Sequence, residues 1–233
     1  MKLAIVQPYF MPYIGYFQLL HAVDKAVIYD NIEYTKKGWF NRNRILLQGN
    51  MHTFTVPIKK DSDYLNVDQR FLAENAGKEI VKTLAQIRQN YAKSPFFNDI
   101  YPVIESCFHC KEKNLYRFIF NSIDQLRSLM KISTELIASS EIPIDHSLRK
   151  EEKVMSICSQ LKADVYYNPV GGIDLYDKNE FKEHNIELKF LKTSVFNYDQ
   201  GITEFIPKLS IIDVLMYNGV DKTHSLLELY ELI

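Results

Sequence analysis

The first thirty residues alternate between a buried strand, a helix and a second buried strand, and this order restricts the fold more than any other feature. Leu3–Val6 is a short apolar run ended by Gln7 and Pro8, which is typical of a buried strand. A helix is predicted over Ile14–Val23, and a strand rich in β-branched residues over Ala26–Asp30. Because a helix joins the two strands, we expect them to run parallel in one sheet.

The position of a binding site follows from this strand arrangement. Ligands of parallel sheets bind beyond the carboxyl ends of the strands. The first two carboxyl ends are Gln7–Tyr9 and Asp30–Glu33. We therefore expect functional side chains at these two places.

The rest of the chain continues to alternate between strand and helix patterns. Further strands are predicted at Arg44–Leu47, Met51–Ile58, Ile132–Ala138, Asp164–Tyr167 and, as the final strand, Ile186–Leu191. The first two of these form a hairpin through the Gln48–Asn50 turn. Further helices are predicted at Asn75–Asn90, Asn98–Cys110, Leu115–Leu129, Leu148–Leu161 and Lys208–Tyr217, the last stopping at Asn218–Gly219. The prediction is one α/β domain over residues 1–233, with a parallel-sheet core, a β-hairpin and a helical insertion at about 75–130.

Charge balance and cysteine content restrict the class of protein. The chain has 28 Lys plus Arg and 29 Asp plus Glu, a net charge of −1, which argues against a dedicated duplex-DNA binder. Its three cysteines form no disulfide framework, which favours a reducing cytoplasm. The longest uncharged stretch, Leu3–Val23, includes two prolines and is a poor membrane span. We expect a cytoplasmic protein with no nucleic-acid partner and no membrane insertion, and homo-oligomer formation stays open.

The motifs of several familiar chemistries are missing. With 8 glycines, the chain has no G-x-G-x-x-G dinucleotide motif, no P-loop and no G-x-S-x-G elbow. Cys107 and Cys110 have the C-x-x-C spacing but no second pair, so no metal site is predicted. The 15 tyrosines can supply hydroxyl groups to a sugar or nucleotide site, or simply the edge of the core.

The densest polar group begins at the end of the second strand. Asp30 and Glu33 can act as a base or hold Mg²⁺, and Lys36 follows them closely. The alternative is an ordinary turn, where Asp and Asn are common. We treat Asp30, Glu33 and Lys36 as the candidate catalytic residues.

A basic segment with no acidic residue follows, from Tyr34 to Lys60. Arg42 and Arg44 share one face of a predicted strand, where two guanidinium groups can hold a diphosphate or a carboxylate. Asn41 and Asn43 share the other face. The alternative is a solvated basic strand.

Two further polar places lie in the last third of the chain. Gly171 and Gly172 follow a predicted strand and either admit a ligand close to the backbone or form a turn. Gln200 precedes the last predicted helix, in which Ser210 and Asp213 lie three residues apart on one face.

With these residues in view, the chain resembles the WbqC-like protein family of bacterial polysaccharide gene clusters. The matching segments are Gln7–Phe17, Asp30–Lys36, Trp39–Ile45, Tyr198 with Gln200, and Leu209–Leu215 closing on Asn218–Gly219. The chain differs at Asn31–Glu33, where the family more often has Asp-Val-Gln, and at Tyr13, where Trp is common. A second, weaker similarity is to adenylating nucleotidyltransferases, although Tyr13 and Tyr16 replace the histidines of their His-x-Gly-His motif. The resemblances imply a Rossmann-like or nucleotidyltransferase-like core.

The family's context implies a cytoplasmic role in O-antigen and related glycan synthesis. The leading hypothesis is an amide-forming acyl or aminoacyl transferase acting on a nucleotide-linked amino-dideoxy sugar. An ATP-dependent amide ligase is a variant of it, and a need for ATP or Mg²⁺ stays open. The alternatives are a non-catalytic nucleotide-sugar binding or scaffolding protein of a glycan complex and, less favoured, a single-stranded RNA binder. The expected substrate-binding residues are Gln7, Pro8, Tyr9, Tyr13, Gly15, Tyr16, Tyr34, Asn41, Arg42, Asn43, Arg44, Gly171, Gly172, Gln200, Ser210 and Asp213.

Overall fold

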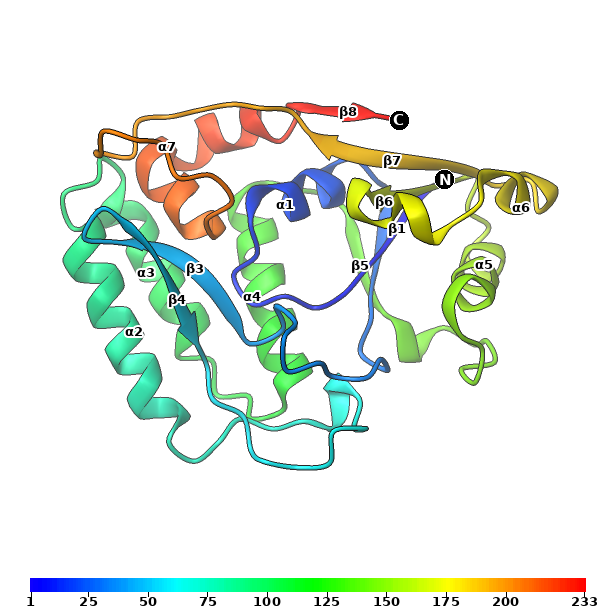
Figure 1. Ribbon diagram of the computed structural model, residues 1–233, viewed down its shortest axis with the longest axis horizontal. Helices are drawn as coiled ribbons and strands as arrows, with labels where there is room; N and C mark the ends of the chain where they lie inside the picture. Colours follow the sequence, from blue (N-terminus) through cyan, green and yellow to red (C-terminus); the bar gives the residue numbers. More distant parts are fainter.

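A six-stranded sheet with the strand order β5-β2-β1-β6-β7-β8 forms the centre of the molecule (Figure 1). The structure is a computed structural model that describes residues 1–233. The strands are β1 (Lys2–Val6), β2 (Lys25–Ile28), β5 (Glu135–Ala138), β6 (Val165–Pro169), β7 (Glu187–Thr193) and β8 (Tyr230–Leu232). The first five run parallel, which confirms the predicted Rossmann-like α/β core. The prediction that the seventh strand is the last was wrong, because β8 pairs antiparallel with β7 through only three residues, too few for a pattern to reveal.

Both faces of the sheet are covered, because alternate side chains of each strand enter different cores. Ala4 and Val6 belong to a large cluster with α1 (Ile14–His21), α4 (Leu115–Leu129) and α7 (Ile211–Leu226). Leu3 and Ile5 belong to a smaller cluster with α5 (Lys150–Gln160) and α6 (Lys178–Glu183). The apolar run of β1 is therefore explained by burial on both sides. None of the helices combines the length and the hydropathy that a membrane span requires.

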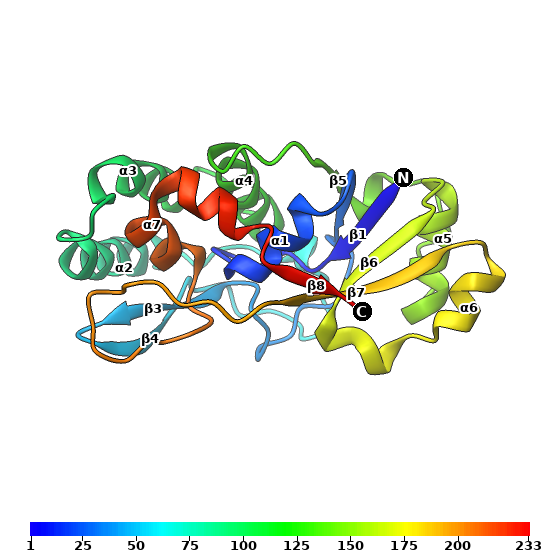
Figure 2. The same ribbon diagram turned by 90° about the horizontal axis from the view of Figure 1, so that it is seen from above.

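The hairpin lies apart from the sheet, at the end of the molecule that also carries α2 and α3 (Figures 1 and 2). Its strands are β3 (Arg42–Leu47) and β4 (Asn50–Thr55), with Gln48 and Gly49 in the turn at positive φ. Helices α2 (Ala76–Tyr91) and α3 (Phe97–Phe108) precede α4, so three helices occupy the segment between the hairpin and β5. The Tyr91 hydroxyl accepts a hydrogen bond from the Leu46 backbone N–H at 2.9 Å, which ties β3 to α2.

The last helix differs from its prediction at both ends. It begins at Ile211 rather than Lys208, because Ser210 is its N-cap and accepts from the Ile212 N–H at 3.3 Å. Gly219 interrupts the helix at φ 68° and ψ −176°, and a second helical segment continues to Leu226. A Cβ at position 219 would lie 2.7 Å from the Phe96 ring, so this backbone and this contact both require glycine.

The order of strands determines where a ligand can enter. Helix α1 joins β1 to β2 and packs in the large core, whereas α5 leads into β6 and packs in the small core on the other face. From β1 the sheet continues to β2 on one side, and from β6 it continues to β7 on the other, so the strand order reverses between β1 and β6. At such a switch point the loops separate, which leaves a crevice outside the carboxyl ends of the two strands.

Candidate functional site

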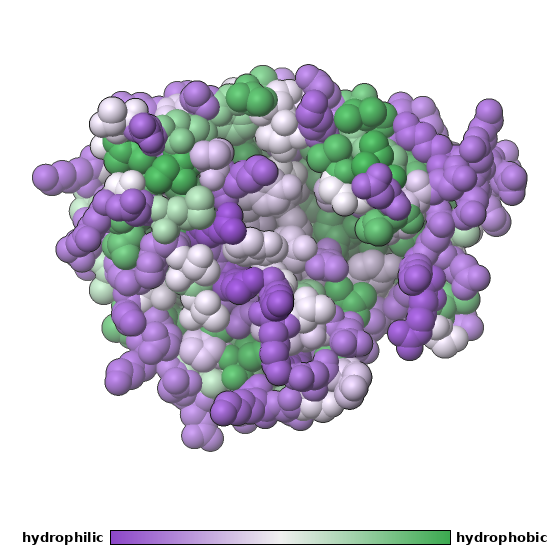
Figure 3. All heavy atoms as spheres, viewed as in Figure 1, coloured by the Kyte–Doolittle hydropathy of each residue, from purple (hydrophilic) through white to green (hydrophobic).

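A cleft of about 1020 Å³ lies at this switch point. Gln7 from the end of β1, Asn31 from beyond β2 and Asn168 from the end of β6 all line it. Figure 3 shows this face hollowed near its centre, where pale and green residues lie deeper than the purple rim. The cleft therefore occupies the place that the first two predicted strands indicated.

Tyrosines dominate the lining of the cleft. Seven tyrosines line it: Tyr9, Tyr13, Tyr16, Tyr29, Tyr64, Tyr166 and Tyr176. The Tyr9 hydroxyl donates to Gln7 Oε1 at 3.0 Å, and the Tyr16 hydroxyl donates to the Gln7 carbonyl at 3.1 Å. Burial raises the pKa of Tyr9, with Tyr13 adding to the effect, so this hydroxyl stays protonated at neutral pH. Rings with protonated hydroxyls offer stacking surfaces and hydrogen-bond donors to a ligand.

The charges in the cleft are mostly positive. Arg149, Lys150 and Lys153 line one wall at the start of α5, and Glu33 is the only carboxylate residue in the lining. Lys153 is 7% exposed and makes no ion pair. Its ammonium donates to Asn31 Oδ1 at 3.1 Å and lies 5.4 Å from the centre of the Tyr29 ring. A buried cation that makes no ion pair favours an anionic ligand.

Burial lowers the pKa of Lys153, while the Asp30 carboxylate opposes the shift and Arg149 adds to it. Part of the Lys153 population is therefore neutral at a pH where an exposed lysine is fully charged. An anion bound beside the ammonium reverses this effect, because it stabilises the charged form.

Asp30 does not line the cleft but holds its floor. Asp30 is 4% exposed, and its Oδ1 accepts from Ser139 Oγ at 2.6 Å, the Ser140 N–H at 3.0 Å and the Asn31 N–H at 2.9 Å. Its Oδ2 accepts from Ser140 Oγ. These bonds join the end of β2 to the 3-10 helix that follows β5. With its oxygens occupied, Asp30 serves as a positioning residue for Asn31, and no group of three or more His, Cys, Asp or Glu is placed to hold a metal ion.

Asn31 connects Asp30 to His146, which also lines the cleft. Its Nδ2 lies 2.9 Å from His146 Nδ1, and His146 Nε2 lies 3.0 Å from the Ile142 carbonyl oxygen. An amide nitrogen can only donate and a carbonyl can only accept, so His146 is the neutral tautomer with its proton on Nε2. This arrangement leaves Asn31 Oδ1 turned toward Lys153.

The hairpin arginines lie outside the cleft. The Arg42 Nε donates to the Gly38 carbonyl at 2.9 Å, and Arg42 also donates to the Lys37 carbonyl. The guanidinium carbons of Arg42 and Arg44 lie 5.2 and 4.6 Å from the centre of the Trp39 ring. Both cations therefore have partners within their own segment, and neither faces the cavity that Glu33 lines.

The other polar residues of this segment also have internal partners. The Asn41 Nδ2 donates to the Val56 carbonyl at 2.7 Å, and the Asn43 Nδ2 donates to the Met11 carbonyl at 2.8 Å. Tyr34 donates to Asn41 Oδ1 at 2.9 Å, and Lys36 is ion-paired with Asp63 at 2.8 Å. These residues attach the hairpin to its surroundings and do not line the cleft.

Comparison with known proteins assigns the chain to a family. The sequence model of the WbqC-like protein family matches residues 7–225, which include every residue that lines the cleft except Ile5 and Val6. The chain belongs to the WbqC-like protein family. It is 29% identical over 226 residues to the uncharacterized protein Rv1507c of Mycobacterium tuberculosis, covering 94% of this chain and 95% of that protein. No solved structure matches this WbqC-like protein.

Three residues expected to bind substrate in the last third of this WbqC-like protein form a buried network instead. Asp213 accepts from the hydroxyls of Tyr91 at 2.8 Å and Tyr198 at 2.6 Å, and from Gln200 Nε2 at 2.8 Å. Ser210 Oγ donates to the Met11 carbonyl at 2.7 Å. Burial raises the pKa of Asp213, although all three donors oppose the shift. Gln200, Ser210 and Asp213 line neither the cleft nor a second cavity beside it, but they hold the walls of that cavity.

The remaining expected residues are divided between the cleft and its surroundings. Gln7, Tyr9, Tyr13, Gly15, Tyr16, Gly171 and Gly172 line the cleft, whereas Pro8 is buried outside it. Gly172 is required by a close contact, since a Cβ there would lie 2.2 Å from Asn168 Nδ2. Gly171 and Gly172, for which a turn was one of the two expectations, lie in a 3-10 helix, Val170–Leu175, that follows β6.

The sequence interpretation missed the basic wall. Arg149, Lys150 and Lys153 stand at the start of a helix together with Glu151 and Glu152, so the charges of this segment nearly cancel in the sequence. The helix itself was predicted, and it leads toward a strand at the sheet centre. Only the structure shows that the three cations line the cleft and that the two glutamates between them do not.

Proposed function

We propose that this protein transfers an acyl or aminoacyl group to the amine of a nucleotide-linked amino-dideoxy sugar in bacterial surface polysaccharide (O-antigen) biosynthesis. The observation that carries the proposal is the cleft at the switch point, with three cations on one wall and a single carboxylate, Glu33, in its lining. A nucleotide sugar supplies the matching anion as its diphosphate. Because nucleotide sugars are cytoplasmic metabolites, we place the reaction in the cytoplasm.

The size and composition of the cleft support this class of acceptor. Sites for small molecules usually measure about 300–1000 Å³, and the cleft of about 1020 Å³ accommodates a base, a diphosphate and two sugar rings. The diphosphate lies against Arg149, Lys150 and Lys153, and the tyrosine rings stack on the base and the sugars. The hairpin arginines take no part in this arrangement.

The transfer itself needs a base for the attacking amine. The amine nitrogen forms a bond to the donor's carbonyl carbon, the bond from that carbon to the leaving group breaks, and the nitrogen loses a proton. We assign Glu33 to accept that proton, because it is the carboxylate that lines the cleft. Asp30 positions Asn31, and Lys36, paired with Asp63, has no role in the reaction.

Calorimetry and a transfer assay test the proposal in sequence. Uridine and thymidine diphosphates should bind more tightly than the nucleosides, because only the diphosphates carry the charge that the basic wall recognises. Incubation with nucleotide-linked amino sugars and activated acyl donors, followed by mass spectrometry, should then reveal the amide product. The absence of diphosphate binding would refute the proposal.

A matched pair of variants separates catalysis from binding. Glu33→Gln should lose product formation by about 10²–10⁴-fold, the usual contribution of a general base, and should retain diphosphate affinity. Glu74→Gln, an exposed residue outside the cleft, is the control and should behave as the wild type. Binding without any product in the wild type would favour the non-catalytic scaffold alternative.

A further inference from the structure

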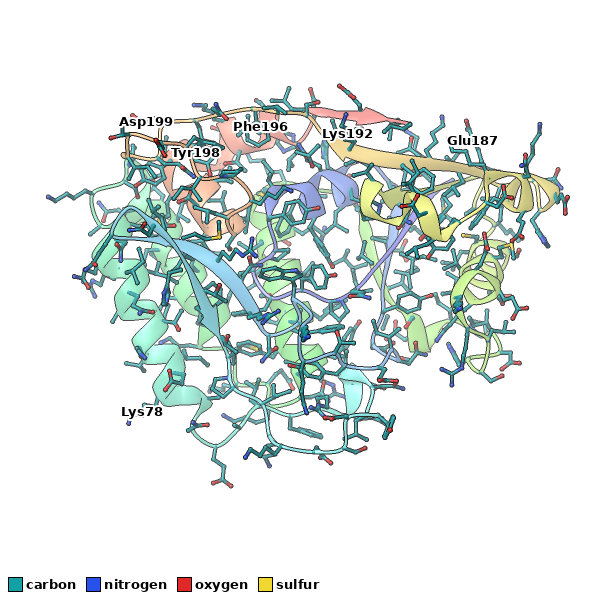
Figure 4. All side chains as sticks on the ribbon, in the orientation of Figure 1. Lys78, Glu187, Lys192, Phe196, Tyr198 and Asp199 are labelled. Carbon is teal, nitrogen blue, oxygen red and sulfur yellow. The ribbon has the colours of Figure 1, made fainter.

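A second cavity of about 760 Å³ adjoins the cleft. It is formed by the start of α1, by the segment from Leu191 to Tyr198 that leaves β7, by the loop around Phe205–Leu209, and by Val214 of α7. Figure 4 shows Lys192, Phe196 and Tyr198 along this segment as it passes over α7. The cavity therefore has walls from parts of the chain that contribute nothing to the basic wall of the cleft.

The two cavities meet at a common border. The residues that line both are Tyr13, Gly15, Leu19, Pro169 and Gly171. Gly15 allows the Tyr13 ring to lie against the backbone there, because a Cβ at position 15 would be 2.3 Å from the ring and 2.7 Å from Thr193 Oγ1. Two ligands, one in each cavity, would therefore approach each other beside Tyr13.

The second cavity differs chemically from the cleft. Its lining is mainly aliphatic and aromatic, with Phe196, Phe205 and Val214 among its walls, and it contains no carboxylate residue. Its only charged residues are Lys208 and Lys192, and Lys192 is ion-paired with Glu231 at 3.7 Å, which leaves Lys208 for an anion. An apolar chain with one anionic end matches this combination.

Hydrogen bonds and an aromatic contact hold parts of the walls of the second cavity in place. The Tyr198 hydroxyl is fixed by Asp213, and the Phe205 ring packs edge-on against Tyr198 with ring centres 5.1 Å apart. The Gln200 Oε1 accepts from the Ile206 N–H at 2.7 Å, which fixes the loop that carries Phe205. A preformed apolar cavity binds a ligand without a further ordering cost.

From this adjacency and chemistry we infer that the second cavity binds the acyl group of the donor, an apolar chain whose activated end carries negative charge. The inference rests on the proposed function, because that function places the nucleotide sugar, with the acceptor amine, in the adjoining cleft. The acyl carbonyl then lies at the border beside Tyr13 and Gly171. The substrate class follows: the transferred group is a hydrophobic acyl group rather than a charged or strongly polar one.

Octanoate is a suitable probe for the second cavity. It has neither a base nor a diphosphate with which to bind in a nucleotide site. Titrated into protein saturated with uridine diphosphate, octanoate should bind measurably more tightly than acetate, because only its chain fills the cavity. Ser194→Trp places an indole at a half-buried position of the wall and should weaken octanoate binding by about tenfold or more. Ser128→Trp, at an exposed position of α4, is the control and should leave the affinity unchanged.

A second variant, Val170→Trp, and a second ligand, uridine diphosphate, distinguish failure of the inference from failure of the proposed function. Val170→Trp obstructs the cavity from a second position, an exposed residue directly after β6, so the test does not depend on one variant folding normally. Uridine diphosphate affinity should stay within about twofold in Ser194→Trp, since that residue lies outside the cleft. Equal binding of octanoate and acetate, or octanoate binding that neither variant weakens, would overturn the inference. Octanoate binding without diphosphate binding would instead refute the proposed function and leave the apolar site standing.

Discussion

The hairpin and the start of α5 each gather several cationic side chains, but these cations differ in what surrounds them. In the hairpin, Arg42 donates to two backbone carbonyls and lies, like Arg44, on the Trp39 ring. At the start of α5, Arg149 and Lys150 are exposed at an open cleft. Their neighbour Lys153 is buried there and makes no ion pair.

This difference shows why the number of basic residues is a poor guide to a binding site. A guanidinium group that is already bonded to carbonyls and stacked on an indole stabilises its own loop and has few donors left for a ligand. A buried cation that lines an open cleft and makes no ion pair gains most of its stabilisation when an anion binds beside it. The two regions therefore predict opposite responses to substitution, which the next experiments compare.

The largest expected effect is that of Lys153→Met on diphosphate binding. Methionine fills a similar volume without the charge, so the bound diphosphate would lose a buried ionic partner and uridine diphosphate affinity should fall by about 30- to 100-fold. Isothermal titration calorimetry measures the change. Lys78→Met is the matched control, since Lys78 is exposed on α2, far from the cleft (Figure 4). Unchanged affinity in Lys153→Met would remove α5 from the binding site.

A smaller effect is expected from pH, because burial lowers the pKa of Lys153. Below that pKa the ammonium is charged and attracts the diphosphate, and as pH rises through it the charge and the attraction are lost. Uridine diphosphate affinity should therefore fall, by up to about tenfold, at a pH below the ordinary lysine pKa of about 10.4. Calorimetry at pH 7 to 10 measures the decline.

The variant Lys153→Arg identifies the group responsible for the pH effect. Arginine keeps its charge throughout this range, so the variant should show a flatter pH profile than the wild type. Tyr9 and Tyr13 line the same cleft, but burial raises the pKa of each, so neither competes as the source of the decline. An equally steep decline in Lys153→Arg would contradict the assignment.

The local parts of the fold were predictable because they depend on short patterns. The apolar run of β1, the helix α1 and the strand β2 follow one another within thirty residues, and the parallel sheet follows from that order. The hairpin turn at Gln48–Gly49 is equally local. In the same way, the position of the cleft followed from the carboxyl ends of β1 and β2.

The contacts that define the site were not predictable, because they join distant parts of the chain. Asp30 meets Ser139 across 109 positions, and Lys153 meets Asn31 across 122. Asp213 was expected to bind substrate because of its place on a helix face, yet Tyr91, 122 positions away in the chain, donates a hydrogen bond to it. A pattern shows that a polar residue needs a partner, but only the tertiary structure shows whether the partner is already present.

The smallest expected effect on binding is that of Arg42→Ala, which tests the other side of the comparison. Removing the guanidinium breaks its bonds to the Gly38 and Lys37 carbonyls and its contact with Trp39, so the free energy of unfolding should fall by about 1–2 kcal/mol. Uridine diphosphate affinity should stay within about twofold of the wild type, because Arg42 lies outside the cleft.

Urea denaturation and calorimetry on the same preparation of Arg42→Ala measure the two quantities together. Arg117→Ala, at an exposed position of α4 where the side chain makes no hydrogen bond, is the control and should change neither. A large loss of affinity with unchanged stability would mean that the hairpin, and not α5, recognises the anion. In that case Arg42 would have to leave the Gly38 and Lys37 carbonyls and the Trp39 ring in order to bind the ligand. The Trp39 fluorescence should then change when uridine diphosphate is added.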